Sequence, residues 1–263
     1  LVRPGALQVY ERLTGALGRA PERAALTPPL KIIDPVGLCA GSIGRDPELW
    51  TEEDRDPELT RLAGAPVYRL DAGVLLGRCL RTMKNPFNFA ATAYARSAYE
   101  SIHGYGGGRL INPDKWFHWR LLGVVREALF VDAPLFAYRW HPANQTAQQL
   151  KAGALKYLAD EYATVLEVEA NLLERAKVTR AELESAFIER DVIRHGAATL
   201  AKGNRGRARR ILRFGEATFP ELVRGNGAAF GLRLVLALGA VGEWAAGVAL
   251  RRRQSSECQP RPS

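Results

Sequence analysis

Residues 104–146 hold the clearest structural signals of the chain and read GYGGGRLINPDKWFHWRLLGVVREALFVDAPLFAYRWHPANQT. It opens with a glycine-rich turn at residues 104–106 and continues with a segment of helical character at residues 114–122. Two short apolar and aromatic runs follow at residues 128–131 and 135–139, and such runs predict strands. Alternation of a helix with strands indicates an α/β fold.

The chain before this stretch carries further signals of the same class. Residues 7–17 have apolar side chains at helical spacing and predict a helix. Residues 28–37 predict a strand with a turn behind it. The acidic segment 41–64, rich in Pro and Asp, is either a solvated loop or a pair of short helical turns. Residues 88–96 predict a buried strand, and residues 97–100 open the helix that leads into the glycine turn.

From Gln148 onward the composition changes to one dominated by Ala, Leu, Glu and Lys, and the strand signals end. Helices are predicted over residues 148–177, 181–202, 205–216 and 228–252. We therefore expect a boundary near residue 147, between an α/β domain at 1–147 and an all-α region at 148–263. One pair of these helices has the spacing of a tetratricopeptide-type hairpin, but a single hairpin cannot bury both its faces, so a packed helical extension is favoured over a repeat array.

Charge is unevenly distributed along the chain. The formal net charge is +9, and residues 200–263 hold 12 Lys or Arg against 4 Asp or Glu. A basic partner surface, if present, is therefore expected in the C-terminal part. Its basic residues are not interleaved with aromatic residues and form no recognition motif, so no nucleic acid is expected as a partner.

The cysteines indicate the cellular compartment of the protein, and the first residues indicate whether more chain precedes them. Cys39, Cys79 and Cys258 lie far apart without CxxC spacing, so neither a zinc site nor a disulfide framework is predicted, and a reducing cytoplasmic compartment fits best. The first residues lack the continuous apolar core of a signal peptide. The sequence begins at Leu1 and its only methionine is Met83, so we expect that a longer polypeptide precedes Leu1.

Two groups of residues have side chains suited to acid–base catalysis or to binding an anion. Asp114 is a carboxylate at an otherwise apolar and aromatic helix start, where the helix N-terminus favours the ionised form that a general base requires. The structural alternative is that Asp114 is only an N-cap. Arg139, His141 and Asn144 converge at the end of a predicted strand and would suit a clamp for an anion. The alternative there is a surface strand end with Trp140 packed inward.

Taken in order, these features resemble the C-terminal half of a family 2 glycosyltransferase with the GT-A fold. In that family a strand ending in a basic residue leads to a helix, a Gly-aromatic turn, an acidic residue followed six positions later by Arg, and a closing Tyr-Arg-x-His strand end. The matching residues are Ala95-Arg96-Ser97, Gly104-Tyr105, Asp114 with Arg120, and Tyr138-Arg139-Trp140-His141, with Asn144 and Thr146 as the polar tail. The resemblance covers roughly residues 1 to 150, and its first part matches mainly in layout.

The resemblance implies the acceptor-side portion of a GT-A domain that transfers a sugar, with inversion, from a nucleotide-diphospho sugar to a glycan, lipid or protein acceptor, in cell-surface polysaccharide or glycoconjugate synthesis. It implies Asp114 as the base and a divalent metal, Mg²⁺ or Mn²⁺, which His141 would reach. The expected substrate-binding residues are Arg96, Gly104, Tyr105, Trp116, Arg139, His141 and Asn144. Of these, Trp116 would stack on a sugar ring, although a buried aromatic is the commoner fate. Pro113 stands where the family more often has an acidic residue, which bears on acceptor contacts.

The family's nucleotide-binding half is not recognisable in this sequence. That half holds the metal through an Asp-x-Asp at the end of an apolar strand, and no such strand precedes Asp54-Arg55-Asp56, which we interpret as a solvated charge run. Residues 104–108 lack the pattern of a phosphate loop and are interpreted as a flexible turn. The chain alone is therefore expected to be incomplete as an enzyme. The alternative function is a non-catalytic remnant that acts as a helical binding module through residues 150–253.

The last predicted helix approaches the length of a membrane span. Residues 228–250 are mostly apolar, but Arg233 and Glu243 argue against spanning, because each charge near a bilayer centre costs about 2.5–3.5 kcal/mol. With its arginine-rich flanks the helix would suit an in-plane position on an anionic membrane, which would place the protein peripherally on the inner face of the plasma membrane. Alternatively the helix packs on the preceding helices and leaves the Arg-rich tail in water.

Overall fold

The structure is a computed structural model, and it describes residues 1–17, 24–106, 110, 113–141 and 154–239. The chain forms two compact units, one made of Leu1–Lys151 with Leu166–Arg180 and the other of Ala152–Val165 with Ala181–Ser263. The boundary predicted near residue 147 lies outside the described residues. The return of residues 166–180 to the first unit could not be read from composition, because this segment is as helical as its neighbours.

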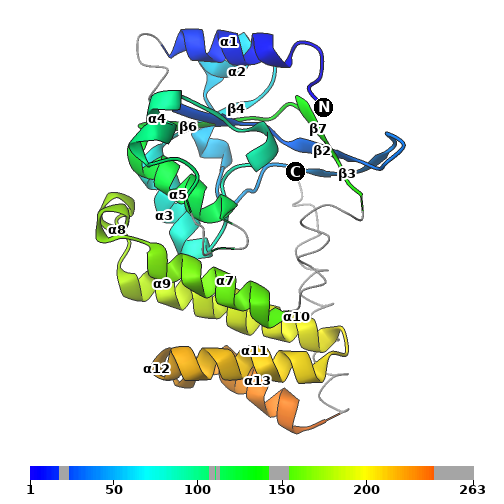
Figure 1. The fold of residues 1–263 in the computed structure, drawn as a ribbon, viewed down its shortest axis with the longest axis vertical. Coiled ribbons are helices and arrows are strands. Elements are labelled where there is room, and N and C mark those ends of the chain that lie inside the picture. Colours follow the sequence, from blue (N-terminus) through cyan, green and yellow to red (C-terminus); the bar gives the residue numbers. More distant parts are fainter. Residues whose placement is uncertain (18–23, 107–109, 111–112, 142–153, 240–263) are drawn as a thin grey trace. The chain divides into compact units, whose positions relative to one another are not determined.

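A four-stranded sheet forms the centre of the first unit (Figure 1). Its strand order is β4-β6-β1-β5, with β1 and β6 parallel and the other two pairs antiparallel. The bounds are Ala24–Thr27 for β1, Val67–Asp71 for β4, Ala93–Tyr94 for β5 and Glu127–Val131 for β6. All four residues of β1 are buried, as expected for an inner strand covered on both faces.

Helices cover both faces of this sheet. On one face α1 (Ala6–Ala16) and α2 (Pro57–Ala63) pack their apolar sides against β1, β4 and β6, with Leu13, Leu59 and Leu129 at the centre of the core. On the other face lies α3 (Ala72–Thr82), which contacts β4, β6 and α5 (Asp114–Val124). The unit is therefore layered as helix, sheet and helix (Figure 1).

A second sheet has three strands, in the order β3-β2-β7. Strand β2 (Leu30–Ile33) is parallel to β7 (Phe136–Arg139) and antiparallel to β3 (Cys39–Ile43), whose five residues are all exposed. The first unit also contains α4 (Arg96–Ser101), α8 (Ala170–Ala176) and the short 3-10 turns η2 (Glu52–Asp54) and η3 (Phe89–Ala91).

Helix α8 is fixed to α3 and α5 by close backbone approach and by an arginine. The Arg175 side chain donates from Nε to the Leu122 carbonyl at 3.0 Å and from Nη2 to the Val125 carbonyl at 2.5 Å. These carbonyls lie at the C-terminal end of α5, where no intrahelical donor is available. On α3, a Cβ placed on Gly77 would lie 2.7 Å from the Ala176 carbonyl oxygen, so only glycine lets α8 approach so closely.

Replacing Gly77 by Ala is expected to destabilise the first unit by roughly 1–3 kcal/mol, because the added methyl group forces the backbone of α8 to move. The matched control is Gly15→Ala in α1, where a Cβ would meet nothing within 4 Å. That change should be neutral or stabilising by up to about 1 kcal/mol, since Ala favours a helix over Gly. Denaturant unfolding of both variants measures the difference, and equal effects of the two substitutions would contradict the close packing of α8.

The second unit is entirely helical over its described residues. It contains α9 (Arg180–Phe187), the π-helical segment η4 (Ile188–Arg194), α10 (His195–Ala201), α11 (Arg205–Thr218), α12 (Pro220–Arg224) and α13 (Gly227–Ala237), together with most of α7 (Ala154–Glu167). Its core includes Phe187, Val192 and Leu212, and Tyr162 packs edge-on against Phe214 and Phe219.

The predicted class, α/β followed by helices, agrees with this architecture, and most predicted elements are present. Three predictions need correction. Residues 88–96 form the turn η3 and a strand of only two residues, β5, not one buried strand. The helix predicted over 148–177 is divided between α7 and α8. Within 41–64, the pair of short helical turns is present as η2 and α2, but β3 occupies the beginning.

The C-terminal helix is described only in part. Helix α13 covers Gly227–Ala237, and the predicted continuation from residue 240 to 252 lies outside the described residues. No described helix combines the length and the apolar character that a membrane span requires.

Candidate functional site

The first unit contains a cavity of about 590 Å³ between the three-stranded sheet and the start of α5. Strand β2, the end of β3, the segment around Phe87 and the end of β7 contribute its walls. The described lining residues are Leu30, Ile32, Ile43, Asn85, Phe87, Asn88, Phe89, Ala90, Tyr105, Pro113, Asp114, Tyr138 and Trp140. Asp114 is the one acidic side chain among them, so the carboxylate singled out from the sequence does face a cavity.

Asp114 is the first residue of α5, and the N-cap position is occupied by Pro113. The alternative that Asp114 serves only as an N-cap is therefore wrong. The Tyr105 hydroxyl donates a hydrogen bond to Oδ1 of Asp114. Burial, with the neighbouring Asp114 carboxylate, raises the pKa of Tyr105, so its hydroxyl remains a protonated donor at neutral pH. Asp114 thus has one oxygen held by the protein.

Aromatic packing fixes the position of Tyr105. Its ring lies 5.0 Å from that of Phe89 and 4.8 Å from that of Phe117, both measured between centroids. Phe117 is fully buried on α5, one helical turn from Asp114. The hydroxyl and the carboxylate are therefore both held by the same helix start and its aromatic cluster.

The walls combine apolar surfaces with amide groups. Phe87, Phe89, Tyr138 and Trp140 supply aromatic surface, and Asn85 and Asn88 supply polar groups. Asn88 is itself fixed, because its Nδ2 donates to the Pro28 carbonyl at 2.8 Å. Cavities of this size, mostly apolar with a few placed polar groups, are typical of small-molecule binding sites.

His118 lies behind this wall and does not titrate near neutrality. Complete burial lowers its pKa to about 3, so the imidazole is neutral. Its Nδ1 lies 2.7 Å from Oδ1 of Asn85, an acceptor, which assigns the proton to Nδ1. Within the described part of the chain Nε2 is buried without a hydrogen-bond partner. His118 is therefore a buried, neutral residue whose ring bonds to the Asn85 side chain of the cavity wall.

Trp116, predicted to stack on a sugar, does not line the cavity. The Arg120 guanidinium lies 4.1 Å from the centre of the Trp116 ring. Gly106 covers the same ring, since a Cβ there would be 2.8 Å from it. Gly104 and Gly106 have φ angles of +74° and +59°, which glycine adopts without strain. The described part of the predicted flexible turn is thus packed against α5, and Gly104 acts through backbone conformation.

Three further expected substrate-binding residues, Arg96, Arg139 and His141, do not line the cavity. Arg96 is 90% exposed and pairs with Glu100 one helical turn away. Arg139 is exposed and donates to the carbonyls of Asp34 and Pro35, while His141 is exposed at the end of β7. Asn144 lies outside the described residues. Tyr138 and Trp140 line the cavity, whereas Arg139 and His141 do not. Tyr138 and Arg139 are neighbours on β7, where successive side chains point to opposite faces.

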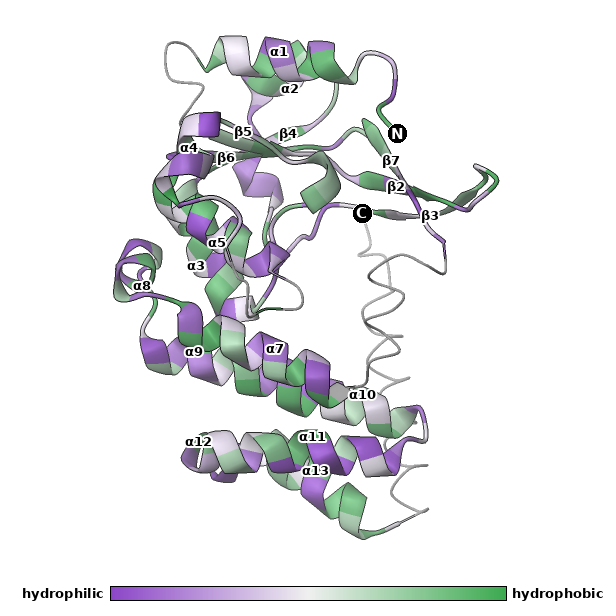
Figure 2. Cartoon of the chain, viewed as in Figure 1, coloured by the Kyte–Doolittle hydropathy of each residue, from purple (hydrophilic) through white to green (hydrophobic). Residues whose placement is uncertain are grey.

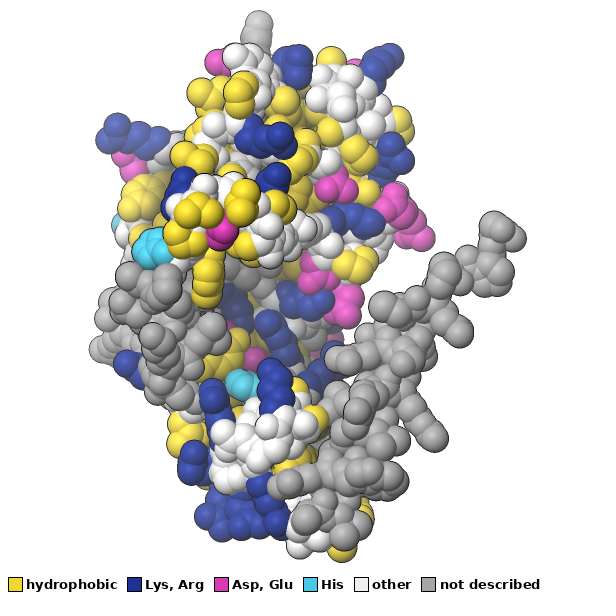
Figure 3. All heavy atoms as spheres, turned by 90° about the vertical axis from the view of Figure 1, so that its right-hand side faces the viewer, with side chains coloured by type: hydrophobic (Ala, Val, Ile, Leu, Met, Phe, Trp, Pro, Cys, Tyr) yellow, Lys and Arg dark blue, Asp and Glu magenta, His cyan; other side chains and the backbone are white. Residues whose placement is uncertain are grey.

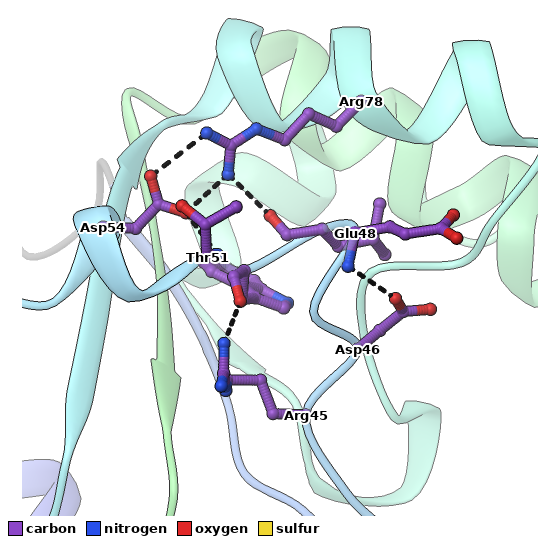
Figure 4. A network of polar contacts seen from close by, with 8 residues as sticks. Arg45, Asp46, Glu48, Thr51, Asp54 and Arg78 are labelled. Carbon is purple, nitrogen blue, oxygen red and sulfur yellow. Dashed lines mark hydrogen bonds and ion pairs between the residues drawn. The ribbon is translucent and has the colours of Figure 1, made fainter. Parts of the chain in front are cut away.

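The two carboxylates of the Asp-x-Asp sequence at residues 54–56 have structural roles, and Figure 4 shows that of Asp54 with Arg78 and Thr51. The Asp54 side chain is 7% exposed and accepts hydrogen bonds from Arg78 and from Thr51. The interpretation of this segment as a solvated charge run is therefore wrong for Asp54. Asp56 caps α2 by accepting from the backbone N–H groups of Glu58 and Leu59. The two carboxylates serve different partners and do not form a metal-binding pair.

The described residues do not fit a divalent cation. Nowhere in the described ranges do three His, Cys, Asp or Glu side chains come together as ligands for one. The cavity supplies a single carboxylate, whereas Mg²⁺ and Mn²⁺ are usually held by several oxygen ligands.

A second cavity of about 490 Å³ adjoins the first and shares Ile43, Asn85, Phe87 and Asn88 with it. Its charged residues neutralise one another, since Lys84 pairs with Asp46 at 2.7 Å and with Glu48 at 2.9 Å. Figure 4 shows Arg45, Asp46 and Glu48 at this position. The pairing makes this cavity a less suitable place for an anion such as a diphosphate.

Comparison with family models, with curated proteins and with solved structures found no match to this chain.

Proposed function

We propose that the first unit is the acceptor-binding part of an inverting glycosyltransferase and that Asp114 is its general base. The observation that carries this proposal is the cavity in which a single carboxylate, with one oxygen held by Tyr105, is surrounded by aromatic and amide side chains. Sugars combine apolar C–H faces with hydroxyl groups, so aromatic rings and asparagines suit them as binding partners. The sequence resemblance supports the same assignment.

The geometry gives Asp114 a simple role. With Oδ1 hydrogen-bonded to Tyr105, Oδ2 remains for an acceptor hydroxyl in the cavity. As that hydroxyl oxygen attacks the anomeric carbon, its proton passes to Asp114, and the bond from the anomeric carbon to the nucleoside diphosphate breaks on the opposite face. The nucleotide-diphospho sugar, and the divalent metal that the resemblance implies, would be held by groups other than the described residues of this cavity.

Acceptor binding tests the proposal without requiring turnover. The purified chain is tested against an immobilised panel of oligosaccharides and glycolipids. Trp140→Ala is expected to weaken binding of the retained glycans about ten-fold or more, because stacking and apolar contact are lost from the cavity wall. Trp116→Ala is the matched control, since that ring lies outside the cavity and should leave specific binding unchanged in folded protein.

Two outcomes would count against the acceptor site. One is a chain that retains no glycan on the panel, as the alternative of a non-catalytic helical binding module predicts. The other is glycan binding that is insensitive to Trp140→Ala, which would place the sugar elsewhere on the protein.

A further inference from the structure

An apolar stripe runs along the exposed side of α13 in the second unit. Phe230, Leu234 and Leu238 are 63%, 50% and 58% exposed. They are spaced four residues apart, so they share one face of the helix, while Ala229, Leu232 and Leu236 on the opposite face are buried. Large apolar side chains aligned in this way on a helix surface mark an interaction site more often than scattered ones do.

Arginines connect α11 with α13. Arg205 and Arg209 donate to the carbonyl oxygen of Leu236, which lies two residues from both Leu234 and Leu238. Arg233 forms an ion pair with Glu216 and ties α13 to α11. Two guanidinium groups of α11, those of Arg205 and Arg209, are therefore held at the C-terminal end of α13, the end that carries Leu234 and Leu238.

None of the arginines of α11 makes an ion pair with a described residue. Arg210 and Arg213 are exposed together with Arg209 on the side of α11 opposite its buried residues Ala208 and Leu212. Between Lys202 and Gly239 the sequence has eight Lys or Arg against two Glu. Figure 3 shows Lys and Arg side chains gathered at the lower end of the second unit, and Figure 2 shows the hydrophobic end of α13 beside the more hydrophilic α11.

We propose that α11 and α13 form a docking surface for an anionic lipid membrane. The stripe of Phe230, Leu234 and Leu238 would enter the boundary between headgroups and acyl chains, and the arginines of α11 would contact the negative headgroups. This combination of apolar side chains and neighbouring basic residues is what in-plane membrane helices use. The proposal concerns the second unit and does not depend on the function proposed for the first.

Vesicle co-sedimentation of the full chain tests the proposal. Vesicles of phosphatidylcholine alone are compared with vesicles that also contain phosphatidylglycerol. We expect binding to the anionic vesicles, little binding to the neutral ones, and a decrease with added salt, because salt screens the arginines. Equal binding to both kinds of vesicle, or to neither, would overturn the proposal.

Two pairs of variants locate the surface. Phe230→Ser with Leu234→Ser is expected to reduce vesicle binding at least about ten-fold, because two large apolar side chains no longer enter the lipid. Its control is Leu7→Ser with Val124→Ser, which removes two exposed apolar residues of the first unit.

Arg210→Gln with Arg213→Gln should also reduce binding about ten-fold or more. Its control is Arg12→Gln with Arg61→Gln, the same change of charge on α1 and α2. If the matched pairs lose binding equally, only net charge and overall apolarity matter, and the proposal fails.

Two other occupants of the stripe would give different results. If a second copy of the chain covers it, sedimentation equilibrium shows an oligomer that Phe230→Ser with Leu234→Ser converts to a monomer. If residues 240–263 cover it, the full chain does not bind and a chain ending at Gly239 does. Either result would overturn the proposal that lipid is the occupant.

Discussion

In a preparation of the protein that catalyses sugar transfer, Asp114→Asn is expected to lower the transfer rate by about 10²–10⁴-fold. The reason is that the amide cannot take up the proton of the attacking hydroxyl group. The amide oxygen can still accept the Tyr105 hydroxyl, so the start of α5 should keep its geometry. Acceptor binding should change little. The measurement is release of nucleoside diphosphate at saturating acceptor, together with glycan binding by the same variant.

Asp132→Asn serves as the control, since Asp132 is exposed and does not line the cavity. It should leave turnover unchanged. A folded Asp114→Asn variant that retains a rate within a few-fold of the original would remove Asp114 from the role of base. Loss of transfer with equal loss of acceptor binding would instead indicate that Asp114 mainly holds the substrate.

Arg78→Ala should be the most destabilising of the substitutions considered, at about 3–5 kcal/mol. Arg78 on α3 is the cationic partner of Asp54, and it also donates to the Leu49 carbonyl at 2.9 Å (Figure 4). Removing it leaves a carboxylate that is only 7% exposed without its counter-charge, and breaking a buried pair on one side costs about that much. Denaturant unfolding at neutral pH measures the loss.

A double variant separates the pair from general damage to α3. Arg78→Ala combined with Asp54→Ala removes both charges, so its loss should be smaller than the sum of the two single losses. Burial opposes ionisation of Asp54, but the hydrogen bonds from Arg78 and Thr51 outweigh it, so the pKa of Asp54 lies below its usual value. The stabilisation by Asp54 is therefore complete above its unfolded pKa and is lost as the pH falls through its folded pKa. Simple additivity of the two losses would show that the residues do not interact.

The sequence predicted helices and strands well where local pattern determines them. The helix beginning at Asp114 and the strands that became β6 and β7 agree closely with the structure. Residues 65–87 were not assigned, although they form β4 and α3 beside the central sheet. Asp71 is both the last residue of β4 and the N-cap of α3, so no loop separates the two elements. Gly73 and Gly77 then weaken the helical signal of α3. Glycine is needed at these two positions because α8, which lies far along the chain, packs closely against them.

The candidate site was predicted in part. Asp114 and Tyr105, which line the cavity, were named from the local pattern and from the sequence resemblance. Arg139 and His141 were chosen by residue type, and Tyr138 and Trp140, which line the cavity, were not. Period-two alternation along β7 could have shown that Tyr138 and Arg139 face opposite sides, but not which side faces a cavity. That depends on the parallel pairing of β2 with β7, which joins segments about a hundred residues apart in the sequence.

The position of α8 affects how this chain folds during synthesis. Residues 166–180 complete the first unit, yet residues 152–165, made before them, belong to the second. Until residues 166–180 have been synthesised, the glycine side of α3 has no helix to cover it and the last carbonyls of α5 lack Arg175. The first unit therefore reaches its final form only after part of its neighbour has emerged, and the two cannot be produced separately by cutting the gene at a single point.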